Sequence, residues 1–166
     1  TRDDAAGECF DKVAKMMWLG FPWWAKIAKW AAEYRASHSG QLEWKKRIFP
    51  IVLLEKNSLD FSFSGLKTAV KREVDARILE NHWAPLSNEA IEEISYEVEE
   101  TIAEILSIKL LRALDLTNAK MLCLAGWVSA NSHLKSILSQ YSTLHDVPFL
   151  APVKNLYSMD NAAMVG

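Results

Sequence analysis

Glycine is scarce in this sequence, which contains 6 glycines and 7 tryptophans among its 166 residues. At the usual frequency of about 7%, a chain of this length would hold about 12 glycines, so the ordinary ratio of the two residues is inverted. The few glycines do not form GxSxG, GxGxxG or a GxxxxGK loop. The sequence therefore gives no support for a nucleophilic-serine turn or a standard phosphate-binding loop.

An excess of positive charge is also missing, because 19 Lys and Arg face 21 Asp and Glu, for a net charge of −2. We therefore do not expect this chain alone to bind nucleic acid directly. No apolar run reaches the roughly 18 residues of a membrane span, so we expect no membrane association. Cys9 and Cys123 form no CxxC pair, and the start lacks the apolar core of a signal peptide. These features favour a reducing, cytoplasmic location.

The length predicts a single domain over residues 1–166, with a helical part at about 8–116 and a strand–helix–strand part at about 119–166. Apolar residues recur every three or four positions in much of the chain, as in amphipathic helices. We expect helices at about 10–20, 23–37, 66–79, 88–114 and 129–141, a last helix starting at Asp160, and short strands at 61–64, 120–125 and 147–150. The predicted fold class is α/β, helix-rich, with a small sheet.

Glutamates crowd the N-terminal part of the longest predicted helix, at about 88–114. Acidic side chains early in a helix and basic ones later complement the helix dipole. We therefore predict that this run is a solvated face. Its members are Glu89, Glu92, Glu93, Glu97, Glu99, Glu100 and Glu104.

Candidate chemical groups are sparse when each is judged alone. The four histidines are scattered and include no HxxxH pair, which argues against a histidine metal site. Asp3, Asp4 and Asp11 cluster near the start, and we expect them to be helix caps and surface charges. A predicted strand, turn and helix meet at Gly126, which suits an anion, but the bulky Trp127 follows directly.

An aromatic stripe marks the second predicted helix, where Trp23, Ile27, Trp30 and Tyr34 follow one helical face. Helical spacing of this kind usually marks core. Tryptophan and tyrosine are also enriched where proteins bind partners. The stripe is therefore either core or a surface for a protein partner or for self-association.

Four ordered motifs resemble signatures of the TsaD-type tRNA threonylcarbamoyladenosine transferases. Two of them are TRDDAAGECFDKVAK at 1–15 and LDFSFSGLKT at 59–68. The segment 126–131, GWVSAN, is similar to the family's Gly-Gly-Val-Ser-Ala-Asn. The segment 160–164, DNAAM, is similar to the end of its Cys-Thr-Asp-Asn-Ala-Ala-Met. By this resemblance the chain looks like the C-terminal half of the family.

The resemblance implies an actin-like ATPase fold built on ribonuclease-H-like halves, of which this chain would be a partial subdomain. It also implies transfer of a threonylcarbamoyl group from its adenylate to N6 of an adenosine in tRNA, with a divalent metal beside an adenine nucleotide and with partner proteins. By position, Asp11 and Asn131 match nucleotide-contacting residues, and Asp160 matches a metal-ligand aspartate. Oxygen ligands and polar anchors suit those roles.

Departures from the family pattern bear on the same site. The family's Tyr-Pro-Gly-Gly-Pro stands here as FPWWA at 21–25, which places Trp24 at a nucleotide-approach glycine. Gly-Gly has become Gly126-Trp127. An indole at either position would fill space that a nucleotide needs. The paired metal histidines and the family's first half are absent, so we expect no cofactor in this chain alone.

Two interpretations follow. The first is a non-catalytic, engineered scaffold or binding domain whose nucleotide site is blocked by tryptophan. The second is a segment of a genuine transferase that needs its missing N-terminal half. In either case the strands that precede this region in the family are absent, which predicts exposed sheet edges or a sheet completed by another chain.

Overall fold

The computed structural model describes residues 1–42, 45–52 and 58–152, and the chain forms two compact units, Thr1–Ile105 and Leu106–Gly166. The molecule is helix-rich with a two-stranded parallel sheet, which confirms the predicted fold class. Within the described part of the chain, no helix is both long enough and apolar enough to cross a membrane.

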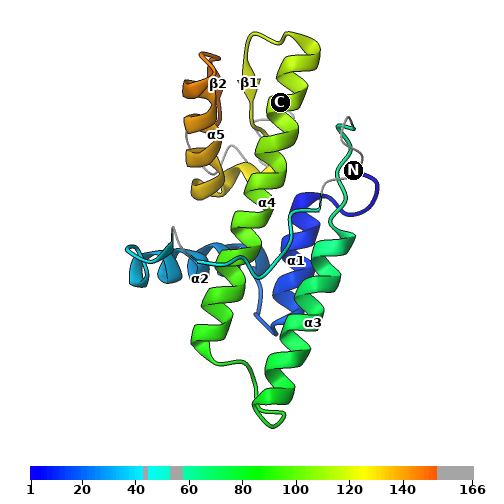
Figure 1. Ribbon diagram of the computed structural model, residues 1–166, viewed down its shortest axis with the longest axis vertical. Coiled ribbons are helices and arrows are strands. Elements are labelled where there is room, and N and C mark those ends of the chain that lie inside the picture. Colours follow the sequence, from blue (N-terminus) through cyan, green and yellow to red (C-terminus); the bar gives the residue numbers. More distant parts are fainter. Residues whose placement is uncertain (43–44, 53–57, 153–166) are drawn as a thin grey trace, which may run out of the picture. The chain divides into compact units, whose positions relative to one another are not determined.

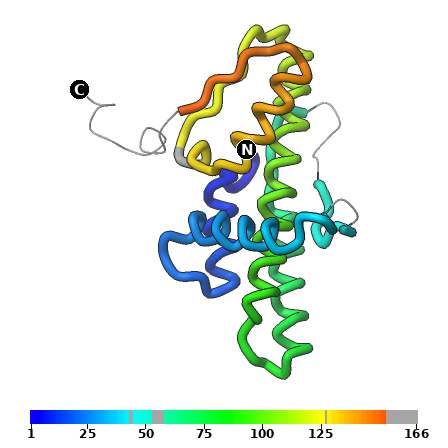
Figure 2. Tube along the Cα trace, turned by 90° about the vertical axis from the view of Figure 1, so that its left-hand side faces the viewer, coloured from blue at the N-terminus to red at the C-terminus, as the bar shows by residue number. Residues whose placement is uncertain are grey.

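Among the described residues, unit 1 contains four α-helices (Figure 1): α1 (Ala6–Met16), α2 (Trp23–Ser37), α3 (Ser64–Glu80) and the first part of α4 (Asn88–Thr117). Helices α3 and α4 run antiparallel and are joined by a short turn, while α2 crosses α4, as the two views show (Figure 2). Ser87 caps α4, because its Oγ accepts a hydrogen bond from the Ala90 N–H at 3.2 Å. The helices lie close to where the apolar period predicts them.

The core of unit 1 is made by one apolar stripe from each helix. Residues four apart lie on the same face of a helix, so each stripe is buried along its length. Fully buried members include Val13 on α1, Ile27 and Ala31 on α2, Val70 and Val74 on α3, and Ile94, Val98 and Ile102 on α4. Burying a side chain of this size contributes about 1.5–3 kcal/mol, so this stripe packing is the main stabilising term.

The prediction of a strand at 61–64 is wrong. Residues 61–63 are irregular, and Ser64 already begins α3. The alternation of Phe and Ser arises because Phe63 is buried while its neighbours are more exposed. The backbone here bonds to the N-terminal segment, with the Arg2 N–H donating to the Phe61 carbonyl at 2.8 Å, and not to a neighbouring strand.

The prediction that the glutamates of α4 form a solvated face is also wrong. Glu97 is only 3% exposed and Glu99 only 2% exposed. A charge buried to this degree is costly unless it is paired and hydrogen-bonded. The pairs are Arg35 with Glu99 and Glu100, Lys45 with Glu93 and Glu97, Arg47 with Glu104, and Arg77 with Glu93. We call these residues the α4 ion-pair network.

The α4 ion-pair network ties three separate segments to one helix. Lys45 lies 2.9 Å from carboxylate oxygens of both Glu93 and Glu97, and Glu97 also accepts the Ile48 N–H at 3.0 Å. Burial opposes the charge of Lys45, but its bonds to Glu97 and Glu93 outweigh that effect and raise its pKa. Burial likewise disfavours the charge of Glu93, but Lys45 and Arg77 outweigh it and lower the pKa of this carboxyl. These side chains therefore stay ionised.

Unit 2 contains the small sheet and helix α5 (Ser132–Leu144). Strand β1 (Leu122–Cys123) pairs in parallel with β2 (Phe149–Leu150), with Leu122 opposite Phe149 and Cys123 opposite Leu150. The strands are shorter than the predicted 120–125 and 147–150. Gly126 turns the chain at a φ of 82°, a conformation that favours glycine, and the short 3₁₀ helix η2 (Trp127–Ala130) leads into α5.

The ion-pair network gives a stability prediction. Glu97→Ala should lower the free energy of unfolding by about 2–3 kcal/mol, because Lys45 loses a buried partner and the Ile48 N–H loses its acceptor. The control is Glu89→Ala, an exposed glutamate on the same helix, which should change it by less than about 0.5 kcal/mol. Urea unfolding followed by circular dichroism measures both. Equal effects would contradict the assignment.

Candidate functional site

The two longest sequence motifs, at 1–15 and 59–68, meet in space within unit 1. Besides the backbone bond from Arg2 to Phe61, the Arg2 Nε donates to a carboxylate oxygen of Asp60 at 2.9 Å. The Phe63 N–H donates to Asp3 Oδ1 at 2.9 Å. Several polar groups of the two motifs therefore form hydrogen bonds and an ion pair that join one motif to the other.

Asp3 acts as a cap for α3 from sixty residues away. Its carboxylate accepts hydrogen bonds from the Ser62 hydroxyl and from the Phe63 N–H just before the helix. Desolvation opposes its charge, but the bonds from Ser62 and from the Phe63 and Ser64 backbone outweigh it and lower the pKa of Asp3 to about 2. Asp3 therefore holds the start of α3, and not the helix nearest to it in sequence.

Asp4 joins α1 to α3 through two lysines. One oxygen accepts from Lys12 Nζ at 2.7 Å, and the other accepts from Lys67 Nζ. The bonds from Lys12 and Lys67 lower the pKa of Asp4. Its side chain is only 12% exposed, so Asp4 is a linking group rather than the surface charge expected from the sequence.

Asp11 lies on α1 and faces the start of α2. The Trp24 backbone N–H donates a hydrogen bond to the Asp11 carboxylate. The Oδ1 atom of Asp11 is buried and has no hydrogen-bond partner among the described residues. Burial raises the pKa of this carboxyl, and nearby Lys15 and the Trp24 N–H only partly offset that effect. The structure thus brings together two predicted site residues, Asp11 and Trp24.

The aromatic stripe of α2 divides into a buried part and a half-buried part. Ile27 and Tyr34 belong to the core, as helical periodicity indicates. Trp23 and Trp30 are half-buried, as is Trp24. The Lys15 Nζ lies 4.1 Å from the centre of a Trp23 ring, which is within the range of a cation–π contact. A partner surface on these tryptophans stays a prediction.

Asn131 lies in unit 2 and caps α5. Its side-chain Oδ1 accepts the Leu134 N–H at 2.9 Å, and the residue is buried. Asp160, the predicted metal-ligand aspartate, lies outside the described residues together with the rest of its motif. The side chain of Trp127 is also outside the described part. Asp11 and Trp24 belong to unit 1, whereas Asn131 belongs to unit 2.

A metal does not fit the residues that the structure describes. Across residues 1–42, 45–52 and 58–152, no three His, Cys, Asp or Glu side chains gather in a way that could hold a metal ion. Asp160 alone would be too few ligands.

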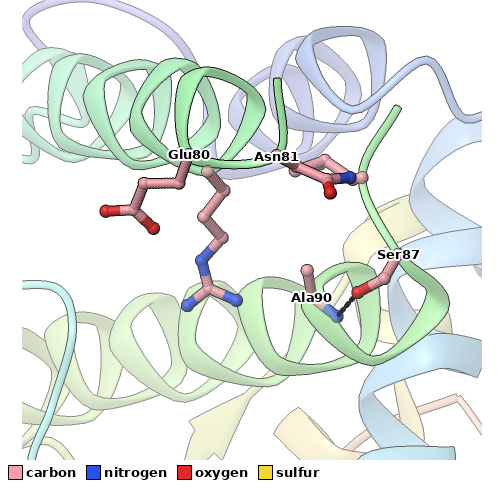
Figure 3. Close-up of a pocket in the computed structure, with 6 residues that line it drawn as sticks. Glu80, Asn81, Ser87 and Ala90 are labelled. Atoms are coloured by element: carbon pink, nitrogen blue, oxygen red, sulfur yellow. Dashed lines mark hydrogen bonds between the residues drawn. The ribbon is translucent and has the colours of Figure 1, made fainter. Parts of the chain in front are cut away.

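One pocket of about 340 Å³ opens at the turn between α3 and α4 (Figure 3). It is lined by Arg77, Glu80, Asn81, Leu86, Ser87 and Ala90. The Arg77 guanidinium is already bound to Glu73 and Glu93, and the Ser87 hydroxyl caps α4. None of the predicted site residues lines this pocket.

Sequence reasoning overlooked Lys67 and Ser62 as partners of the N-terminal aspartates. Both lie inside the motif at 59–68, so the co-occurrence of the two motifs was the available signal. The buried role of Glu97 had no such signal, because its partners Lys45 and Ile48 belong to a segment without a clear period.

Comparison with known proteins identifies relatives along the entire chain. A family model described as "TsaD: tRNA N6-adenosine threonylcarbamoyltransferase" matches residues 1–166. Curated proteins named tRNA N6-adenosine threonylcarbamoyltransferase from Staphylococcus carnosus and Gluconobacter oxydans are 36% and 37% identical to it, over 100% and 99% of the chain. A relative of the same name from Bdellovibrio bacteriovorus is 36% identical over 100% of the chain. The chain spans only 43–44% of the length of these three relatives.

The capping role of Asp3 predicts a stability change that depends on pH. Asp3→Ala should lower the free energy of unfolding by about 1 kcal/mol at pH 7, because α3 loses its cap. The folded pKa lies below the ordinary value of 3.8, so this contribution is present above about pH 4 and is lost as the pH falls toward 2. Urea titrations at pH 7 and pH 2.5 measure it. Asp75→Ala, which removes an exposed pair with Lys71, is the control and should change little.

For Asp11 we predict a pH dependence of stability opposite to that of Asp3. Because burial raises the folded pKa, the ionised carboxylate opposes folding as the pH rises above the unfolded value. Asp11→Asn keeps an acceptor for the Trp24 N–H and removes the charge, so it should raise the unfolding free energy at pH 7 and change it little at pH 3. Thermal unfolding at the two pH values measures this difference. A clear loss of stability at pH 7 would show that the charge of Asp11 is satisfied within the fold.

Proposed function

Because the chain belongs to the tRNA N6-adenosine threonylcarbamoyltransferase family, we propose that it is a segment of a genuine transferase of this kind. It would act together with the remaining length of its relatives, which the 166 residues do not match. The observation that carries this proposal is the match along 99–100% of the chain to curated transferases, against only 43–44% of their own length. The linked motifs at 1–15 and 59–68 add support, because their polar side chains bond to each other and hold this region of the fold together.

The proposed reaction joins a threonylcarbamoyl group to tRNA. The N6 amine of an adenosine attacks the carbamoyl carbon of threonylcarbamoyl-adenylate, a C–N bond forms, the C–O bond to the phosphate breaks, and AMP leaves with the proton lost from nitrogen to solvent. The contribution of this chain is to hold the nucleotide. Asp11 would accept a hydrogen bond from it, since its Oδ1 is buried and has no partner among the described residues.

Other requirements of the reaction fall to the complementary polypeptide. The net charge of −2 gives this chain no general phosphate-binding surface, so tRNA would be bound mainly elsewhere. Asp160 would contribute one metal ligand, and the others would come from the complementary polypeptide. No chemical step in this proposal is assigned to a metal held by this chain.

A non-catalytic binding domain is the second candidate, and the position of Trp24 favours it. This indole stands in the first turn of α2, and its backbone N–H is bonded to Asp11. Asn131 already uses its Oδ1 to cap α5. In this interpretation the groups that would hold a nucleotide serve the fold instead. An engineered origin stays a prediction.

Reconstitution separates the two candidates. The chain is mixed with the part of the Staphylococcus carnosus relative that it does not match, and threonylcarbamoyladenosine is measured in unmodified tRNA supplied with threonylcarbamoyl-adenylate. The transferase proposal expects product above the level made by either polypeptide alone. Asp11→Ala should then reduce the rate at least about tenfold, the loss expected for one hydrogen bond to a charged group.

The control variant is Asp75→Ala, which removes a carboxylate from an exposed pair on α3 and should leave the rate unchanged. Circular dichroism of each polypeptide shows whether it is folded. No product from two folded polypeptides would reject the transferase proposal and favour the binding domain.

A further inference from the structure

The segment 12–32 of unit 1 combines lysines with aromatic rings and contains no acidic residue. Its cations are Lys12, Lys15, Lys26 and Lys29, and its rings belong to Trp18, Phe21, Trp23, Trp24 and Trp30. The chain as a whole has a net charge of −2, so this segment departs from the charge balance of the sequence. Cations interleaved with aromatic rings are typical of surfaces that bind single-stranded nucleic acid.

Two of these four lysines are neutralised within the fold. Lys12 pairs with two acidic residues on its N-terminal side, at 2.7 and 2.9 Å, and Lys29 lies 3.7 Å from Glu33. Among the residues that the structure describes, no ion pair includes Lys15 or Lys26. These two ammonium groups are therefore available to an anion that comes from outside the fold.

The two available lysines flank a group of aromatic rings where α1 leads into α2. The Lys15 Nζ lies 4.1 Å from the centre of a Trp23 ring, and the Phe21 ring meets Trp23 edge to face, with 5.5 Å between the ring centroids. A Cβ added at Gly20 would lie 3.2 Å from the Lys26 Nζ, so this ammonium lies against the backbone next to Phe21. We define the aromatic–lysine surface as Lys15, Trp18, Phe21, Trp23 and Lys26.

Trp18 is held in this surface by a strained backbone. Its φ is 54°, in the left-handed region that a bulky residue rarely adopts, and it is 70% exposed. Trp83, beyond the end of α3, also has a positive φ, 68°, and is 78% exposed. The two indoles line one cavity of about 260 Å³ together with Ile78, Ala84 and Pro85. Two large rings exposed at a conformational cost indicate a binding site rather than a part of the core.

We propose that the aromatic–lysine surface binds an unpaired stretch of RNA. Its bases stack on Trp18 and Phe21, and its phosphates are held by Lys15 and Lys26. Each nucleotide supplies a flat ring and a negative charge, which match the two kinds of group on this surface. No carboxylate within 12–32 repels the phosphates. The inference rests on the proposed function, because the tRNA of that reaction is the RNA that would be bound.

The unpaired lysines favour RNA over an apolar protein surface. A partner that only covered the rings would remove water from Lys15 and Lys26 without supplying a compensating charge, which is costly. Single-stranded RNA carries a phosphate at every nucleotide, so a short bound segment neutralises both ammonium groups. Duplex RNA keeps its bases stacked inside the helix, so it would reach the lysines but not the rings.

The test measures binding of the full chain to a fluorescein-labelled oligoadenylate of about eight nucleotides, a length within the range that single-strand binding surfaces cover. Fluorescence anisotropy at several salt concentrations gives the affinity and its salt dependence. We expect Phe21→Ala to weaken binding at least about fivefold, because one stacked base is lost. Phe21→Tyr is the matched control, because it keeps the ring, and it should bind like the unaltered chain.

The two lysines are tested by the slope of the logarithm of the affinity against the logarithm of the salt concentration. Lys15→Gln and Lys26→Gln should each reduce the size of this slope by about 0.7, the value for one phosphate of a single strand. Lys29→Gln is the control, because this lysine is on the same helix as Lys26 and is already paired with Glu33. Equal slopes in all three variants, or equal affinity for AMP or for duplex RNA of the same length, would overturn the proposal.

A variant of Trp18 separates binding from folding. Glycine adopts a φ of 54° without strain, so Trp18→Gly should unfold at an equal or higher urea concentration than the unaltered chain. The same variant should bind the oligoadenylate at least about fivefold more weakly, because one indole is lost. Unfolding at a clearly lower urea concentration with unchanged RNA affinity would show that this indole serves the fold, and it would overturn the proposal.

These readouts are independent of catalysis. Oligoadenylate binding that depends on Phe21 and on the two lysines, without formation of threonylcarbamoyladenosine, would reject the proposed function and leave the RNA site intact. Product formation at an equal rate in Phe21→Ala, with no oligoadenylate binding by the unaltered chain, would reject the RNA site and leave the proposed function intact. A dimer of this chain that Phe21→Ala abolishes would overturn the proposal in favour of a second copy as the occupant.

Discussion

The fold of unit 1 depends on one constraint. Each of its buried carboxylates needs an ion pair with a lysine or arginine from another segment. Glu97, Glu99 and Asp4 are largely shielded from water, and each is paired with a lysine or arginine distant in sequence. Removing one partner of such a pair leaves an uncompensated charge, so the pairs select one arrangement of the helices more sharply than apolar packing alone. The same pairing uses cations that could otherwise have bound phosphate.

The motifs that identify the family combine two kinds of residue. Asp3 and Asp4 are committed to the fold, since one caps α3 and the other binds two lysines. Asp11 differs, because one of its oxygens is buried with no partner among the described residues and its charge is opposed by burial. Residues held at a cost to stability are more often kept for function than for packing. This contrast is why Asp11, rather than its neighbours, carries the proposed nucleotide contact.

Helices were predictable from the sequence because their signal is local. The spacing of Val13, Ile27 and Val98 within each segment already indicates a buried face, and Ser87 indicates the start of α4. The strand predicted at 61–64 failed because the same alternation arises when Phe63 alone is buried. The prediction that Glu97 is exposed to solvent failed because its partners come from a different segment of the chain. No local pattern in the sequence encodes such a pair. Of the candidate site, the meeting of Asp11 with Trp24 follows only from the packing of α1 against α2.

The central claim is that this chain is a working segment of a threonylcarbamoyl transferase, and its most direct test is made in cells. In cells depleted of their own transferase, the chain and the complementary part of a relative are expressed separately and together, and threonylcarbamoyladenosine is quantified by mass spectrometry of digested tRNA. The account predicts that the modified nucleoside returns only when both polypeptides are present. Its absence, with both polypeptides folded and bound to each other, would contradict the account.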